Sequence, residues 1–198
     1  MAALIHFATT NKGKLASASR ALSDYGIAAR GINFEIPEPR SFDLKEIAHA
    51  KARFAYSRLR RPCIVQDSGF YIASLRGFPR TYVHFVLDTI GTEGILAITR
   101  GRSRACSFRA CLTYYDGKRF YDFTSEYRGS ISESERGSVK PFHWPKIFLI
   151  FIPEGSTKAL AEMSRNDYMR WYDIAKSKSE FVKFGSWYSR KIHSGAAN

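Results

Sequence analysis

The stretch from Cys63 to Gly69 holds the residue types best suited to chemistry. Its sequence, Cys-Ile-Val-Gln-Asp-Ser-Gly, is an apolar run that ends in a carboxylate, a hydroxyl and a glycine. This order predicts a buried strand that delivers Asp67 to a tight turn, and open α/β sheets place their active sites at the carboxyl ends of strands. Asp67 is therefore the first candidate for a catalytic residue.

A polar turn near the amino terminus, Thr9 to Lys14, follows a β-prone segment and precedes residues 15–25, whose apolar positions recur at helical spacing. Because free amides at a helix N-terminus favour anions, this turn predicts a phosphate site. The turn lacks the complete G-x-x-x-x-G-K-[ST] pattern, so it is not a P-loop.

Glu46 has two interpretations. Asp43 and Glu46 have the spacing of a capping box, which predicts a helix that continues to about Leu59. As a capping residue, Glu46 would accept a hydrogen bond from a backbone amide. As a metal ligand, it would lie on the helix face that meets Asp67.

The remaining elements follow from hydrophobic patterning and turn residues, with Asp116-Gly117 as a strong hairpin signal. The pattern predicts strands at 31–39, 105–115, 119–127, 127–132 and 147–152, helices at 82–90 and 92–99, the latter capped by Thr92, and helical structure from 159 to 175.

Composition describes a globular protein with an excess of positive charge. The chain has 198 residues, 44% of them hydrophobic, and a formal net charge of +13. That charge favours polyanionic partners, although a basic surface without a specific ligand would give the same number. Cys63, Cys106 and Cys111 lack metal-ligand spacing and are expected to be reduced thiols. No apolar run approaches the roughly 18 residues needed to span a bilayer, so we expect no membrane partner and a cytoplasmic location.

The order of these motifs resembles the Ham1 or inosine triphosphate pyrophosphatase family, especially its archaeal-type members. The similarity continues through Gly77-Phe78-Pro79, the Asp116-Gly117 hairpin, Ile152-Pro153-Glu154-Gly155 and Ala161-Glu162-Met163, and it covers most of residues 4–175. The resemblance implies an α/β fold with a central mixed twisted sheet and two lobes around a cleft, often a homodimer. We expect a single domain of this kind over residues 1–193, and a disordered tail at 194–198 because chain ends are commonly frayed.

The resemblance also implies an activity, which is hydrolysis of a non-canonical purine nucleoside triphosphate to the monophosphate and pyrophosphate with Mg²⁺ or, as a second choice, Mn²⁺. It assigns catalysis to Asp67, Glu46 and Lys14, with Glu46 and Asp67 as metal ligands. A triphosphate requires cations to offset its charge and a carboxylate to orient the attacking water, which these residue types can supply. The implied phosphate-binding residues are Thr9, Thr10, Asn11, Lys14, Lys51, Ser68 and Gly69.

The resemblance breaks at positions that matter for function. Gln66 stands where the family has an acid, which predicts weaker metal binding. Residues 141–148 replace a glycine-rich base loop, and the Ser-His-Arg triplet that reads a 6-oxo purine is missing at 172–174. Tyr168 replaces a phosphate-contacting lysine, and Arg80 replaces a glycine. Because buried polar groups reject wrong bases, these changes predict altered base specificity or lost turnover.

Five residues are candidates for base binding. Phe142 and Trp144 could stack on a base, although aromatic side chains are as readily part of a core. His143 and Lys146 lie in the same loop, and Arg170 is near the missing triplet but off its register.

Two functions from different classes therefore stand. The first is a nucleoside triphosphate pyrophosphatase with altered base choice. The alternative is a catalytically degenerate protein that binds nucleic acid or a protein partner through its basic surface, including the Lys/Arg-aromatic segment near Trp187. That segment could instead be an amphipathic helix packed on the body of the protein.

Overall fold

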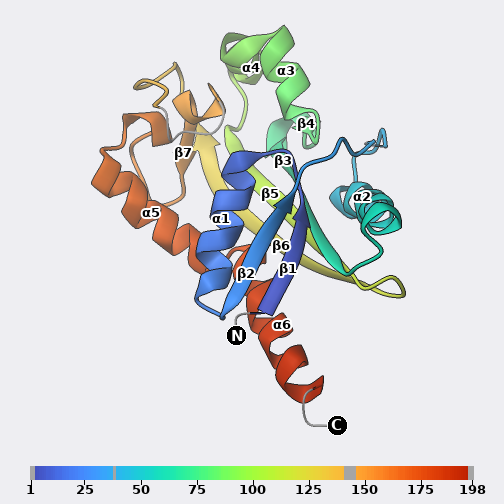
Figure 1. The fold of residues 1–198 in the computed structure, drawn as a ribbon. Coiled ribbons are helices and arrows are strands. Elements are labelled where there is room, and N and C mark those ends of the chain that lie inside the picture. Colours follow the sequence, from blue (N-terminus) through green and yellow to red (C-terminus); the bar gives the residue numbers. More distant parts are fainter. Residues whose placement is uncertain (1–2, 38, 141–145, 196–198) are drawn as a thin grey trace. The chain divides into compact units, whose positions relative to one another are not determined.

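The structure is a computed structural model that describes residues 3–37, 39–140 and 146–195, with side chains as far as Ile192. It is a mixed α/β fold (Figure 1). The strands are β1 (Ala3–Ala8), β2 (Ile27–Ile32), β3 (Cys63–Ile72), β4 (Pro79–Arg80), β5 (Ala105–Tyr115), β6 (Phe120–Ile131) and β7 (Phe151–Pro153). The α-helices are α1 (Lys12–Ser23), α2 (Leu44–Leu59), α3 (Val83–Thr89), α4 (Gly91–Thr99), α5 (Arg165–Ser177) and α6 (Glu180–Gly195).

The strands pair in the order β2-β1-β3-β5-β6-β7, and β4 pairs with β3. Strand β1 is parallel to both β2 and β3, whereas β4 is antiparallel to β3 and β7 is antiparallel to β6. The chain divides into two compact units: the first unit is residues 1–67, 110–125 and 176–198, and the second unit is residues 68–109 and 126–175. Three strands, β3, β5 and β6, contribute residues to both units.

The first unit buries both faces of its part of the sheet. On one face, Ile64 of β3 packs with residues of α1 and α6, including Leu22 and Phe184. On the other face, the neighbouring Val65 packs against the alanine-rich side of α2 around Ala52. Successive residues of a strand point to opposite faces, so β3 presents its even-numbered side chains to α1 and α6 and its odd-numbered side chains to α2 in this segment.

The second unit has its own core. Phe70 and Ile72 of β3 pack with the apolar sides of α3 and α4, exemplified by Val86 and Ile95, and with Phe151 of β7. Cys106 is buried in this core, whereas Cys111 is buried in the core of the first unit beside α2.

The sequence wrongly predicted a tight turn at Asp67-Ser68-Gly69, because β3 continues without a break to Ile72. Gly69 is needed for a different reason. A Cβ atom at this position would lie 2.5 Å from the Arg80 carbonyl oxygen, since β4 pairs closely with this part of β3. The glycine therefore permits close strand approach rather than a reversal of the chain.

Four other expectations are corrected. The strand expected at 31–39 is β2, which ends at Ile32, and the strand expected at 147–152 is mostly a 3₁₀ turn that precedes the short β7. The separate strand at 127–132 is the end of the long β6. Thr92 does not cap α4, because its hydroxyl donates to Glu135 instead.

At the carboxyl end, α6 includes residues 194 and 195 of the expected tail, while residues 196–198 lie outside the described chain. Over the described residues, none of the helices combines the length and apolar character that a membrane span requires.

Candidate functional site

The turn after β1 is organised by its own side chains. Asn11 is the N-cap of α1, and its Oδ1 accepts a hydrogen bond from the Lys14 backbone amide at 3.0 Å. Thr9 Oγ1 accepts the Asn11 amide at 3.1 Å. The first turn of α1 carries no acidic residue, so nothing local offsets the positive end of the helix. This geometry is compatible with an anion, and the phosphate site stays a prediction.

Lys14 reaches from α1 to β3. Its ammonium group donates to the Gln66 carbonyl oxygen at 3.3 Å. The paired register of β1 and β3 extends only to Phe7 and Ile64, so Gln66 lies past the end of that pairing. The ammonium group of Lys14 is therefore held where the parallel strands end, immediately before Asp67.

Asp67 is approached from α2. Its Oδ2 lies 3.8 Å from Nζ of Lys51, and both side chains are largely buried, with 13% and 10% of their surfaces exposed. Because α2 covers the opposite face of the sheet from α1, consecutive residues of β3 are contacted by lysines from two different helices. The first unit thus brings together Asp67, Lys51, Lys14 and the Thr9–Asn11 turn.

Glu46 is exposed on the first turn of α2 and does not complete the expected capping box. Its Oε2 accepts a hydrogen bond from the Ser41 hydroxyl at 2.7 Å, and the Asp43 amide donates to the Ser41 oxygen at 3.0 Å. Asp43 caps the helix as predicted, through the Lys45 amide at 2.8 Å. Glu46 therefore accepts a hydrogen bond from a side-chain hydroxyl and not from the backbone amide that the capping interpretation assigned to it. Its role as a metal ligand stays a prediction.

Gln66 points away from Asp67. Its side chain lies on the α6 face of β3, where Nε2 donates to Glu180 at 3.1 Å. Its side-chain amide is therefore directed at Glu180 and toward α6. The sequence did not predict a role for Glu180. An acid in the first turn of a helix is common, and nothing in the sequence connects it to Gln66, which is 114 residues away.

Another cluster was missed by sequence reasoning. Asp122 of β6 contacts Nε2 of His49 at 2.9 Å and accepts the Thr113 hydroxyl at 2.7 Å. His49 also stacks on Phe120 at 4.2 Å between ring centroids. These contacts fasten α2 to the sheet and so help to place Lys51. No spacing in the sequence reveals this cluster, because its members come from three separate segments.

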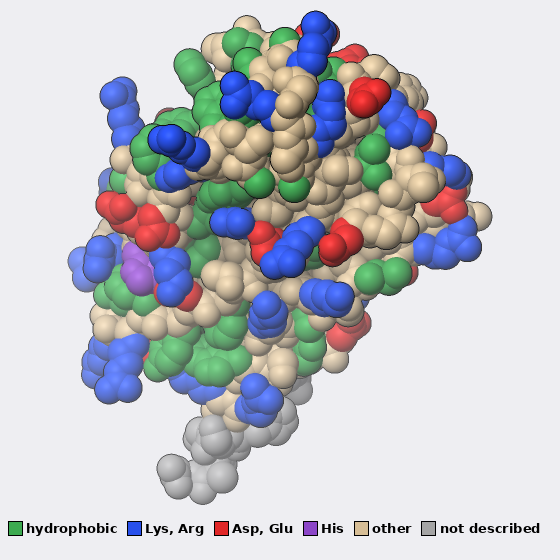
Figure 2. All heavy atoms as spheres, turned by 180° about the vertical axis from the view of Figure 1, so that it is seen from behind, with side chains coloured by type: hydrophobic (Ala, Val, Ile, Leu, Met, Phe, Trp, Pro, Cys, Tyr) green, Lys and Arg blue, Asp and Glu red, His purple; other side chains and the backbone are tan. Residues whose placement is uncertain are grey.

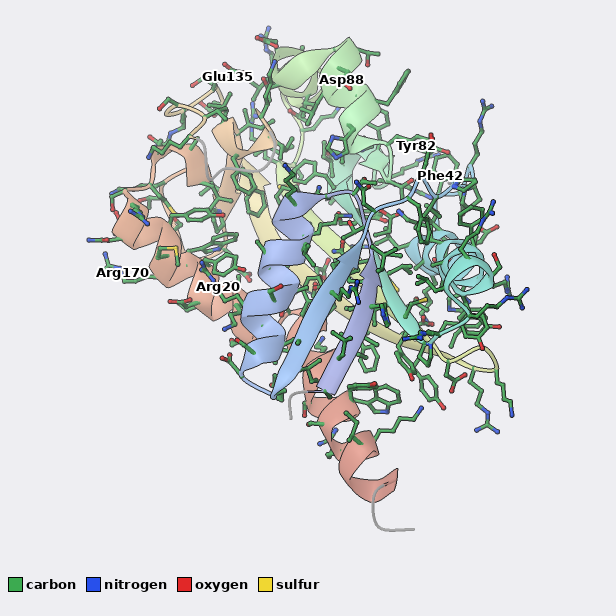
Figure 3. The ribbon with its side chains drawn as sticks, in the orientation of Figure 1. Arg20, Phe42, Tyr82, Asp88, Glu135 and Arg170 are labelled. Carbon is green, nitrogen blue, oxygen red and sulfur yellow. The ribbon has the colours of Figure 1, made fainter. Side chains whose placement is uncertain are left out.

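The remaining predicted residues divide as follows. Ser68 and Gly69 follow Asp67 in β3 and belong to the second unit. Lys146 is exposed, and Arg170 lies on the outer side of α5, where it pairs with Asp167 on the same helix (Figure 3). Phe142, His143 and Trp144 lie outside the described residues.

Among the described residues there is no group of three or more His, Cys, Asp or Glu side chains placed to hold a metal ion. The donor chemistry of Asp67 and Glu46 nevertheless fits Mg²⁺, which is commonly bound by one or two carboxylates together with substrate phosphates. The cysteines are not candidates, because burial raises the pKa of Cys63 and Cys106 to about 12 and that of Cys111 to about 11.

A groove of about 840 Å³ lies within the second unit. It is lined by four arginines and two glutamates, together with Tyr71 and other residues of β5, β6 and β7. Glu126 accepts from Arg109 at 3.0 Å and from Arg128 at 3.4 Å. Burial alone would raise the pKa of Glu126, but hydrogen bonds from Ser107 and Arg109 outweigh it and hold the pKa below its usual value. The lining arginines are Arg76, Arg80, Arg109 and Arg128.

Basic side chains are spread over the surface rather than confined to the groove. Figure 2 shows Lys and Arg side chains across the face that it presents, interspersed with Asp and Glu side chains. In α6, Phe181 and Phe184 are buried and Trp187 packs on the same core. The packing interpretation of this helix is therefore confirmed for its aromatic residues.

Comparison with known proteins identifies a family. The Ham1 family model matches residues 5–182. The dITP/XTP pyrophosphatase of Methanopyrus kandleri is 37% identical over 188 residues, covering 94% of this chain and 96% of the relative. That of Saccharolobus solfataricus is 36% identical over 184 residues, covering 92% and 94%. The Ham1 protein structure from Staphylococcus aureus has a TM-score of 0.77 at 20% identity, covering 95% of this chain and 99% of that one. The expected mixed α/β fold is thereby confirmed.

Proposed function

Because the chain belongs to the Ham1 family, we propose that it hydrolyses a nucleoside triphosphate to the monophosphate and pyrophosphate. Its relatives that are named dITP/XTP pyrophosphatases support this class of reaction. The observation that carries the proposal is the meeting of Lys14 and Lys51 at residues 66 and 67 of β3. One ammonium group lies beside the Asp67 carboxylate and a second lies at the carbonyl oxygen of the preceding residue. Cationic groups and a carboxylate are the elements that water attack on a polyphosphate requires.

In the proposed reaction the N-terminus of α1 and Lys14 bind the phosphates. Asp67 accepts a proton from water as the water oxygen bonds to the α-phosphorus, and the α–β bridging bond breaks to release pyrophosphate. Lys51 holds the Asp67 carboxylate in place from α2. A Mg²⁺ ion held by Asp67 and Glu46 with phosphate oxygens would offset the charge of the triphosphate.

Residues 170–174 differ from a base-reading Ser-His-Arg triplet. Arg170 pairs with Asp167 on the surface, and residues 172–174 are Tyr-Asp-Ile, so neither supplies a buried polar reader. We therefore propose a base specificity different from that of an inosine-selective site. A homodimer and a cytoplasmic location complete the proposal, by analogy with the family.

Pyrophosphate release from a panel of canonical and modified NTPs and dNTPs, with Mg²⁺ and with Mn²⁺, tests the function. We expect turnover of at least one triphosphate by the wild type and a loss of about 10³-fold or more in Asp67→Asn, which keeps the shape of the side chain. Folding of both proteins is checked by circular dichroism. Folded wild type without release from any nucleotide would refute the catalytic proposal.

The arginine-lined groove favours a second candidate function, the binding of single-stranded nucleic acid. Arginine guanidinium groups bind phosphates in a bidentate manner, and the four in the groove exceed its two glutamates. The groove lies entirely in the second unit. It therefore provides a specific location for the attraction that the net charge predicts.

Fluorescence anisotropy with a labelled single-stranded oligonucleotide at several salt concentrations tests this candidate. We expect the double variant Arg109→Ala/Arg128→Ala to lower the slope of log affinity against log salt by about 1, for the loss of up to two phosphate contacts. Arg20→Ala on α1 of the first unit is the matched control, since it removes a surface arginine far along the chain from the groove (Figure 3). Equal losses in both variants would point to unspecific attraction instead.

A further inference from the structure

Glu180 is a buried acid that the proposed reaction does not use. It lies in the first turn of α6, and only 4% of the residue is exposed. Both carboxylate oxygens accept hydrogen bonds, Oε1 from Gln66 Nε2 at 3.1 Å and Oε2 from the Ser125 hydroxyl at 2.5 Å. Acidic side chains are rarely buried to this extent, because removing the charge from water is costly unless it is satisfied.

The partners of Glu180 link it to the candidate site. Gln66 is adjacent to Asp67 in β3, and its carbonyl oxygen accepts the Lys14 ammonium group. The Gln66 side chain thus connects to α6 while its main chain connects to α1. All of these residues belong to the first unit.

The orientation of the Gln66 amide depends on Glu180. Gln66 Oε1 is buried and accepts no hydrogen bond from any described residue. Rotating the amide by 180° would direct its oxygen at the Glu180 carboxylate, so the orientation with Nε2 toward Glu180 is the favourable one. A buried acceptor without a hydrogen bond, such as Gln66 Oε1, is destabilising. The strong hydrogen bond from Gln66 Nε2 to the charged Glu180 carboxylate offsets this cost.

We propose that Glu180 is a positioning residue for the phosphate-binding lysine. By holding the side chain of Gln66, the carboxylate fixes β3 at this residue and hence the carbonyl oxygen that anchors Lys14. Ser125 of β6 donates to Oε2 of Glu180, whereas Gln66 donates to Oε1, so Ser125 stabilises the acid through the oxygen that is not in the link to Lys14. This inference rests on the proposed function, because it assigns Lys14 to the triphosphate.

The test compares Glu180→Ala with Ser125→Ala. The second variant removes one hydrogen bond to the Glu180 carboxylate but keeps the hydrogen bond between Glu180 and Gln66. We expect Glu180→Ala to raise KM for the triphosphate about tenfold with little change in kcat, because a misplaced Lys14 ammonium group would lose a charged hydrogen bond to the substrate. Ser125→Ala should lower stability and leave KM within about twofold of wild type. If Glu180→Ala does not fold, Gln66→Met removes the same link from the strand side and should raise KM equally.

A double-mutant cycle with Lys14→Met separates positioning from general stability. In the Lys14→Met background, Glu180→Ala should cause no further rise in KM, while its effect on urea unfolding should persist. Additive effects on KM, or an unchanged KM in Glu180→Ala, would overturn the inference while the pyrophosphatase stands. Absence of both turnover and triphosphate binding in the folded wild type would refute the proposed function and this inference with it.

Discussion

The ion pair between Lys51 and Asp67 allows a quantitative prediction. Its nitrogen and oxygen lie 3.8 Å apart, and both side chains are nearly buried. At an effective dielectric constant of about 20, two unit charges at this distance attract with on the order of 4 kcal/mol. Removing one member of a buried pair leaves the other charge desolvated, so we expect Lys51→Met to lower the free energy of unfolding by about 3 kcal/mol.

The matched control lies on the same helix. Lys45 is 3.6 Å from Asp122, a similar distance, but 57% of its side chain is exposed. Exposed pairs contribute about 0–1 kcal/mol, so Lys45→Met should change stability by less than about 1 kcal/mol. The comparison of these two lysines therefore isolates the effect of burial from that of distance.

Urea denaturation followed by circular dichroism measures both variants, together with Asp67→Asn and the double variant Lys51→Met/Asp67→Asn. We expect a coupling free energy of about 2 kcal/mol between Lys51 and Asp67, because the double variant buries neither charge of the pair. A coupling below about 0.5 kcal/mol would refute the reasoning and would mean that solvent or other groups satisfy Asp67.

Three further predictions concern other parts of the molecule. Gly69→Ala should lower the free energy of unfolding by about 3 kcal/mol, because its Cβ would meet the backbone of Arg80. Gly31→Ala should lower it by about 1 kcal/mol or less, since its Cβ meets only the tip of the flexible Leu15 side chain. Urea denaturation of the two variants measures both values. The three buried thiols, whose pKa burial raises to about 11 or 12, should react with Ellman's reagent at the rate of unfolding, and a fast reaction of native protein would contradict their burial. The pKa of Glu126 is lowered in the folded protein, so its hydrogen bonds contribute stability above the pKa it has when unfolded and lose it as pH falls through the lower folded value. Arg109→Gln should therefore destabilise the protein at about pH 7, and the difference from wild type should shrink as the solution is acidified through the glutamate titration.

Local signals predicted much of the fold. The Asp116-Gly117 turn, the Asp43 cap and the helical spacing of α2 each depend on neighbouring residues, and the structure contains all three as expected. The prediction of a turn at Gly69 was wrong because this glycine is required by the close approach of Arg80, and only the pairing of β3 with β4 reveals where Arg80 lies. The strand expected at 147–152 failed because a continuous apolar run is equally compatible with a buried 3₁₀ turn.

The candidate site shows the same division. Lys14, Lys51 and Asp67 were found from motif order, and the first unit brings them together. Glu180 was missed because its partner Gln66 is 114 residues away in sequence, and no local pattern marks an acid for burial. Side-chain contacts between distant segments are set by tertiary packing, which single-sequence periodicity does not encode.

The helix α6 changes how the two candidate functions should be separated. Its aromatic residues pack in the core, and Lys191 is held over the Trp187 ring and near Asp116, so the segment that suggested nucleic-acid binding is engaged within the first unit. Through Glu180 the same helix contacts the strand that carries Asp67. The arginine groove, in contrast, lies within the second unit. Catalysis and polyanion binding therefore depend on different residues. Asp67→Asn should abolish pyrophosphate release and leave oligonucleotide binding intact, whereas Arg109→Ala/Arg128→Ala should lower the salt dependence of binding and leave turnover intact.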